Sequence, residues 1–187
     1  IIGAGIVGAA CAFRLAAEGL SVAIIEENIV GGGTTAAGMG HIVAMDDSEA
    51  QFALTRYSQT LWNDLANHLP TACEYEFCGT IWVAADDEEL AEAKKKKDFY
   101  ENHGVKAEIL DEKNLLAAEP NLRKGLAGGL LVENDSVVYQ LSATSYFIEQ
   151  AEKRGATLFL GKKAIEILDD GVRLADSSVI HAKDVIN

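Results

Sequence analysis

Three glycines and one glutamate near the start of the chain have the types and spacing that a dinucleotide site needs. Gly3 permits a tight turn, Gly5 lets the backbone approach a pyrophosphate, and Gly8 lets a helix pack closely on a strand. Backbone N–H groups at the start of that helix attract the anion. Glu26 ends the next apolar run, where a carboxylate accepts hydrogen bonds from ribose hydroxyls. A carboxylate there disfavours the 2′-phosphate of NADP and leaves both NAD and FAD open.

The sequence pattern around this motif predicts a βαβ unit. Its parallel sheet should be covered on both faces. A return to the same pattern after residue 133 predicts a helix, a strand, a meander of short strands and one more buried strand. In chain order, the elements expected at the two ends are a strand at 1–2, a helix at 9–17, a strand at 21–26, a helix at 141–154, a strand at 157–160, turns at 169–171 and 176–178, and a strand from 184.

The middle of the chain differs in character. Residues 48–51 form a capping-box pattern that opens a helix. The apolar residues that should share one face of this helix are Leu54, Tyr57, Leu61, Leu65 and Leu69. Further elements expected here are a strand pair at 75–77 and 80–84, a charged helix from Asp86 or Asp87 to 103, a strand at 105–110, a short helix after Asp111 and a strand at 125–132.

We therefore expect an α/β, Rossmann-like domain made of residues 1–45 and 133–187, interrupted by an inserted α+β segment at 46–132. The chain begins and ends within apparent strands, so we expect it to be truncated at both ends. Between the two parts, residues 31–41 are too rich in glycine for a regular element and too apolar for a solvated linker.

The glycine motif, Glu26 and the Thr-Thr-Ala-Ala-Gly-Met run at 34–39 resemble the D-amino acid oxidase family of FAD-dependent amine and amino-acid oxidoreductases. The likeness continues through Gly128 to Val132 and through residues 182–187, so it covers nearly the whole chain. It implies that the domain made of two segments binds FAD and that the inserted segment, at 46–132, belongs to a substrate domain.

Carried over position by position, the resemblance implies cofactor contacts for ten residues. Gly3, Gly5 and Gly8 would meet the pyrophosphate, and Glu26 the adenosine ribose. Thr34 and Thr35 would meet the pyrophosphate and the ribityl chain, Gly38 and Met39 would offer backbone to the flavin ring, His41 would lie beside the ring, and the backbone of Ala164 would meet adenine.

Composition excludes several other classes of protein. The chain has 16 Lys and Arg against 29 Asp and Glu, a net charge of −13, which repels nucleic acid and anionic lipid. The sequence has no apolar run long enough to cross a membrane, and no basic segment precedes an apolar core as a signal peptide would require, so we expect a cytoplasmic protein. Its three cysteines and four histidines lack the spacing of a metal site.

The expected function is oxidation of the C–N bond of a small amine or amino acid, by hydride transfer to FAD. The chain shows no catalytic constellation, and its catalytic residues are left unassigned; the piece alone should be inactive. Two alternatives stay open: an NAD-dependent dehydrogenase, and a non-catalytic nucleotide-binding or assembly module. The individual substrate, the electron acceptor and the presence of a partner subunit or homo-oligomer are not determined by the sequence.

Overall fold

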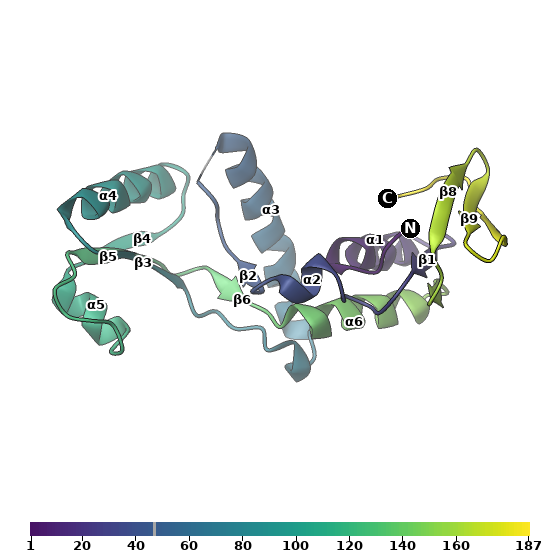
Figure 1. The fold of residues 1–187 in the computed structure, drawn as a ribbon. Helices are drawn as coiled ribbons and strands as arrows, with labels where there is room; N and C mark the ends of the chain where they lie inside the picture. The colour runs from purple at the N-terminus through teal and green to yellow at the C-terminus, as the bar shows by residue number, and fades with distance from the viewer. Residues whose placement is uncertain (47) are drawn as a thin grey trace. The chain divides into compact units, whose positions relative to one another are not determined.

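The computed structural model describes residues 1–46 and 48–187, which divide into two compact units (Figure 1). Unit 1 comprises residues 1–40, 69–74 and 139–187, and unit 2 comprises residues 41–68 and 75–138. The short piece at 69–74 belongs to unit 1 because it packs on the helix that follows residue 139. The division into a domain of residues 1–45 and 133–187 and an inserted segment at 46–132 stays a prediction.

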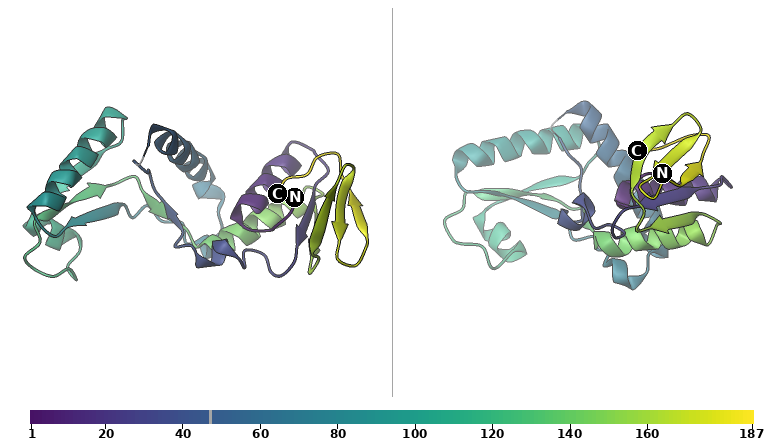
Figure 2. Two further views of the ribbon diagram at one scale, coloured as in Figure 1. Left: turned by 45° about the horizontal axis from the view of Figure 1, so that its top comes forward. Right: turned by 45° about the vertical axis from the view of Figure 1, so that its right-hand side comes forward.

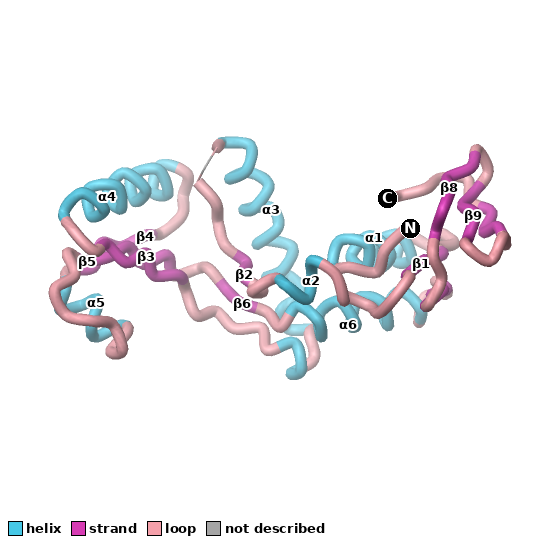
Figure 3. Tube along the Cα trace, in the orientation of Figure 1, coloured by secondary structure: helices cyan, strands magenta, loops and turns pink. Residues whose placement is uncertain are grey.

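Unit 1 has the α/β arrangement expected from the sequence, and its parallel sheet is confirmed. Its elements are α1 (Ile6–Ala17), β1 (Ala23–Glu26), α2 (Thr34–Ala37), η2 (Thr71–Cys73), α6 (Gln140–Glu152), β7 (Thr157–Leu160), β8 (Ala164–Leu168), β9 (Gly171–Leu174) and β10 (Val179–His181). Strands β1 and β7 pair in parallel from Ala23 opposite Thr157 to Glu26 opposite Leu160. The last three strands form the expected antiparallel meander, in the order β10-β9-β8. Strands β8 and β9 of this meander are labelled in Figure 3.

The two chain ends of unit 1 lie beside the sheet rather than forming full strands. Ile2 makes a single parallel bridge to Ile25, and its N–H donates to Ile186 O at 2.8 Å. The strand expected from residue 184 is therefore wrong for the described structure, in which residues 184–187 form no strand and Ile186 is 41% exposed. A single backbone hydrogen bond joins this segment to Ile2, and one bond does not make a β-ladder.

Helices α1 and α6 pack side by side in unit 1 (Figure 2). Small residues at their contact allow the two backbones to approach closely. The fully buried alanines of the two helices are Ala9 and Ala12 in α1 and Ala143 and Ala151 in α6. The rings of Phe13 and Phe147 meet with their centroids 5.3 Å apart.

Unit 2 is built on a three-stranded antiparallel sheet in the order β3-β5-β4. Its elements are β2 (His41–Ile42), α3 (Glu49–Leu65), η1 (Ala66–His68), β3 (Thr80–Ala84), α4 (Asp87–Asn102), β4 (Ala107–Leu110), α5 (Glu112–Ala118), β5 (Gly128–Val132) and β6 (Ser136–Val137). Successive side chains of a strand point to opposite faces. Accordingly, Leu130 lies in the hydrophobic cluster that includes residues of α4, whereas Leu131 packs against the hydrophobic cluster that includes a residue of α5.

Three local expectations for the loops and for unit 2 are wrong. Residues 75–77 do not pair with 80–84: β3 pairs with β5, and Glu76 instead makes one bridge to Val137. Residues 34–37 form a one-turn helix, α2, within the glycine-rich loop.

The third concerns α3, whose N-cap Ser48 accepts a hydrogen bond from the Gln51 N–H as expected. Of the five residues expected on its core face, Leu54 (68%), Tyr57 (64%) and Leu61 (43%) are exposed, Leu65 is half-buried, and Leu69 lies beyond the end of α3. The buried positions of α3 are Phe52 and Gln59.

Candidate cofactor site

The glycine loop joins the bridge at Ile2 to the start of α1. Gly3 has φ +95°, a conformation that glycine adopts without strain, and its N–H donates to Ile25 O at 2.8 Å. Gly5 is the N-cap of α1, and no side chain caps it. A Cβ on Gly8 would lie 2.1 Å from Gly3 O, so helix and loop can approach this closely only at a glycine.

The first turn of α1 offers backbone N–H groups to an anion. The Ala9 N–H is the first to bond within the helix, to Gly5 O at 2.9 Å, so the N–H groups of Val7 and Gly8 precede the ladder. The helix dipole adds positive potential at the same place. Val7 is 75% exposed, so the turn is open to a ligand. The cradle therefore has the shape and charge that a pyrophosphate requires.

The carboxylate of Glu26 is tied to the glycine loop. Its Oε2 accepts the Ala4 N–H at 2.8 Å, and its Oε1 accepts the Asn28 N–H at 2.8 Å. An ionised carboxylate has about four acceptor positions, so two remain for ribose hydroxyls. Next to it, Glu27 turns outward and pairs with Lys163 at 2.9 Å.

Thr35 holds the start of α1 from the other side. Its Oγ1 accepts the Ile6 N–H at 3.0 Å, and a Cβ on Gly5 would lie 3.2 Å from the same oxygen. Within residues 1–46 and 48–187 the Thr35 hydroxyl donates no hydrogen bond, so it can donate to an anion at this cradle. Thr34 is exposed at the start of α2.

Gly38 and Met39 follow α2, and Met39 is 78% exposed. The Gly38 carbonyl accepts a hydrogen bond from Gln140 Nε2 at 2.6 Å. No pattern in the sequence indicated Gln140, because 102 residues separate it from Gly38 and it is the first residue of an ordinary helix. Only the tertiary contact between α2 and α6 brings the two residues together.

Ala164 starts β8 and is half-buried. Two residues earlier, the Lys162 N–H donates to Glu26 O at 2.9 Å, so the backbone that leads to Ala164 is anchored at the ribose-binding candidate. His41 lies in unit 2, where β2 pairs with β6 and His41 is opposite Val137; its side chain is exposed. The structure thus links Gly3, Gly5, Gly8, Glu26, Thr35 and the approach to Ala164 within unit 1.

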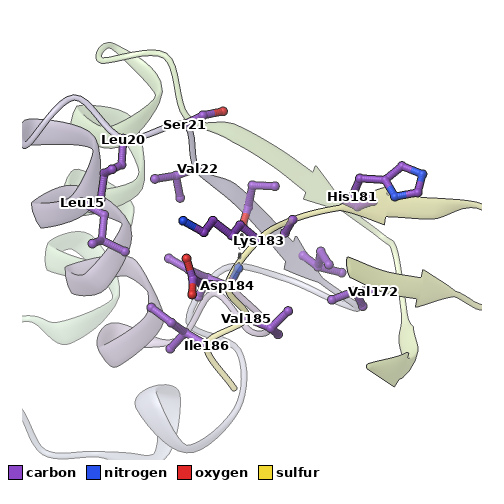
Figure 4. A pocket seen from close by; sticks show the side chains of 15 residues that line it. Leu15, Leu20, Ser21, Val22, Val172, His181, Lys183, Asp184, Val185 and Ile186 are labelled. Carbon is purple, nitrogen blue, oxygen red and sulfur yellow. Dashed lines mark hydrogen bonds between the residues drawn. The ribbon is translucent and has the colours of Figure 1, made fainter. Parts of the chain in front are cut away.

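A cavity of about 600 Å³ in unit 1 is a separate feature (Figure 4). Its lining is mostly apolar and includes Leu15, Val22, Val172 and Ile186. None of the ten residues expected to hold the cofactor lines it. Within residues 1–46 and 48–187, no cluster of histidine, cysteine or carboxylate side chains is arranged to hold a metal ion. No helix in this same part of the chain is long and apolar enough to cross a membrane.

Unit 2 contains a buried polar cluster that the sequence did not reveal. Asp135 Oδ1 accepts the Gln59 Nε2–H at 2.8 Å and the Ala44 N–H at 3.2 Å. Gln59 Oε1 accepts a hydrogen bond from Arg56 Nη1 at 2.7 Å, so Arg56 belongs to the cluster. Burial raises the pKa of Asp135, while hydrogen bonds from Thr80, Ala44 and Gln59 and the charge of Arg56 oppose that rise.

Comparison with known proteins identifies the family. A family model described as "FAD dependent oxidoreductase", DAO, matches residues 1–187. The chain belongs to the DAO family. The expected resemblance is thereby confirmed, and FAD, not NAD, is the cofactor of this family.

Three members show what the chain is similar to. Glycerol 3-phosphate dehydrogenase of Caloramator mitchellensis is 28% identical over 100% of this chain and 40% of its own length. The 4-methylaminobutanoate oxidase (formaldehyde-forming) of Paenarthrobacter nicotinovorans is 25% identical over 100% of this chain and 23% of its own length. The crystal structure of glycine oxidase from Geobacillus kaustophilus matches with a TM-score of 0.89 at 25% identity, covering 97% of this chain and 52% of that one. The chain therefore spans about half or less of the length of these DAO proteins.

Proposed function

We propose that the chain forms the FAD-holding part of an oxidoreductase that oxidises the C–N bond of a small amine or amino acid. The observation that carries this proposal is the cradle at the start of α1, closed by Glu26 on one side and by Thr35 on the other. It supplies free backbone N–H groups for a pyrophosphate and spare carboxylate oxygens for a ribose, both of which FAD contains. The likeness to glycine oxidase supports the substrate class.

In this proposal each residue of unit 1 acts on a different part of FAD. Gly3, Gly5 and Gly8 leave room for the pyrophosphate. Glu26 accepts hydrogen bonds from the adenosine ribose. The remaining assignments are Thr34 and Thr35 to the pyrophosphate and ribityl chain, Gly38 and Met39 to the ring through their backbone, and the Ala164 backbone to adenine.

Unit 2 would supply part of the substrate domain, with His41 beside the flavin ring. Bound FAD supplies the redox chemistry by accepting a hydride from the carbon that bears nitrogen. The residues described here bind and orient the cofactor, and none of them is assigned a catalytic role. A small-molecule amine or amino acid is the proposed substrate.

A second candidate is oxidation of glycerol 3-phosphate. The glycerol 3-phosphate dehydrogenase of Caloramator mitchellensis has the higher identity of the two curated relatives compared, and it matches the whole chain. This reaction removes hydrogen from a carbon bearing oxygen, and it would use the same FAD cradle.

An anaerobic titration of the complete gene product separates these candidates. The visible absorbance of its flavin would be recorded while glycine, sarcosine, D-amino acids, hydroxyproline and glycerol 3-phosphate are added in turn. Loss of the oxidised-flavin bands with an amine or amino acid supports the proposal. Loss only with glycerol 3-phosphate selects the second candidate, and flavin that stays oxidised with every compound contradicts both.

A further inference from the structure

A side chain at the start of α6 fixes the peptide that follows α2. Gln140 Nε2 donates to Gly38 O at 2.6 Å. A carbonyl oxygen can only accept, so the amide nitrogen is the one atom of the Gln140 side chain that can form this bond. Both residues lie in unit 1.

Gly38 is held at both of its polar backbone atoms. Its N–H donates to Thr35 O at 3.1 Å, which closes α2, and its carbonyl accepts from Gln140. Gln140 itself stands on a well-anchored helix, because Ala143 and Thr144 of the next turn are fully buried and the Thr144 hydroxyl donates to Gln140 O at 2.7 Å. The donor is therefore fixed more firmly than the exposed segment it holds.

The Gln140 bond also orients the next N–H group. The peptide between Gly38 and Met39 is trans, and in a planar trans peptide the C=O and N–H bonds point in opposite directions. Since the Gly38 carbonyl points to Gln140, the Met39 N–H points away from it. Met39 is 78% exposed, so this peptide lies at an open surface of unit 1.

We propose that Gln140 is a positioning residue that holds the Met39 N–H toward the flavin ring. The inference rests on the proposed function, in which the backbone of Gly38 and Met39 meets that ring. A fixed donor stabilises the electron density that a flavin gains on reduction, because it needs no reorganisation when the charge develops. Gln140 therefore raises the reduction potential of bound FAD without touching it.

The test measures the two-electron reduction potential of FAD in the purified complete protein and three variants. Gln140→Leu keeps much of the volume and removes the donor. Gln140→Lys restores a donor of sufficient length. Gln150→Leu is the matched control, because Gln150 is also half-buried on α6 but bonds Arg154 at the other end of the helix.

The expected result is a lower potential in Gln140→Leu, by about tenfold in the equilibrium constant, which for two electrons is about 30 mV. Gln140→Lys should not fall below the wild type, and Gln150→Leu should match it. An unchanged potential in Gln140→Leu overturns the inference, as does an equal fall in Gln140→Lys. Flavin loss in both Gln140 variants also counts against it, since orienting one peptide does not predict that loss.

Failure of this inference is distinguishable from failure of the proposed function. A wild-type protein that holds no flavin contradicts the proposed function, and the inference falls with it. A wild-type protein that holds FAD, with a potential that Gln140→Leu leaves unchanged, contradicts the inference alone.

Discussion

The Glu26 carboxylate accepts the Ala4 backbone N–H at 2.8 Å, so the proposed ribose-binding residue also closes the glycine loop. Its second oxygen accepts the Asn28 N–H, and the loop is therefore held in one conformation by the chain itself. A cradle shaped in advance loses less conformational entropy when a ligand binds. This double role makes Glu26 the most informative single position in unit 1.

Glu26→Gln should weaken FAD binding at least about tenfold and lower the stability of the protein. One carboxylate oxygen becomes an NH₂ group, which faces an N–H donor, and a hydrogen bond to a charged group contributes about 1.5–3 kcal/mol. Glu27→Gln is the control, because Glu27 makes only an exposed ion pair with Lys163. Calorimetric titration of each flavin-free variant with FAD measures its affinity for the cofactor. Equal affinities in the two variants would contradict the role of Glu26.

Gly8→Ala should destabilise unit 1 more than Gly5→Ala does. The new methyl at residue 8 would meet the Gly3 carbonyl at 2.1 Å, whereas at residue 5 it would lie 3.2 Å from the Thr35 hydroxyl, which is a side-chain atom and can shift. Overpacking against backbone costs about 1–3 kcal/mol. Thermal unfolding of the flavin-free variants gives the order, and the reverse order would contradict the packing described.

Phe52→Ala should cost about 3–5 kcal/mol, and Tyr57→Ala should cost less than about 0.5 kcal/mol. Phe52 is 6% exposed and meets the ring of Phe99 edge-on at 5.3 Å, whereas Tyr57 on the same helix is 64% exposed. Denaturant unfolding measures both. A large loss in Tyr57→Ala would show that the exposed face of α3 is covered in the complete protein.

Asp135→Asn should flatten the dependence of stability on pH. Burial raises the pKa of Asp135 in the folded protein, so the folded state binds this proton more tightly than the unfolded chain does. The stability contributed by this proton is fully present below the unfolded pKa and is lost as the pH rises through the folded pKa. The Asn variant keeps an oxygen for Gln59 and Ala44 and removes that loss.

Stability curves of the wild type and Asp135→Asn between pH 4 and 8 provide the check. We expect the difference between the two to move in favour of the variant as the pH rises. A difference that stays constant across this range would show that Asp135 titrates as it does in the unfolded chain.

Much of the fold was predictable because local signals and the tertiary structure agree. Ser48 and Asp86 cap α3 and α4 as the sequence indicates, since a short polar side chain at a helix start accepts a hydrogen bond from one of the first N–H groups of the helix. The glycine spacing and Glu26 likewise mark the loop and the end of β1. Each of these features depends on residues that are close in sequence.

The remaining features depend on contacts between distant residues. Tyr57 and Leu54 share a helical face, but periodicity does not say which face finds a partner, and Phe52 and Gln59 turned out to be the buried positions. The pairing of β3 with β5, and the contact of Gln140 with Gly38, join residues too far apart for a local pattern to reveal. The same holds for the cluster around Asp135.

The measurement that tests the cofactor cradle most directly is the flavin content of the purified complete protein. The protein would be denatured, and any released cofactor would be identified by mass and counted per chain. We expect one FAD per chain, released without cleavage of a covalent bond, and loss of it in Glu26→Gln under conditions in which Glu27→Gln retains it. A protein that holds no FAD, or that holds a nicotinamide dinucleotide in its place, would contradict the account.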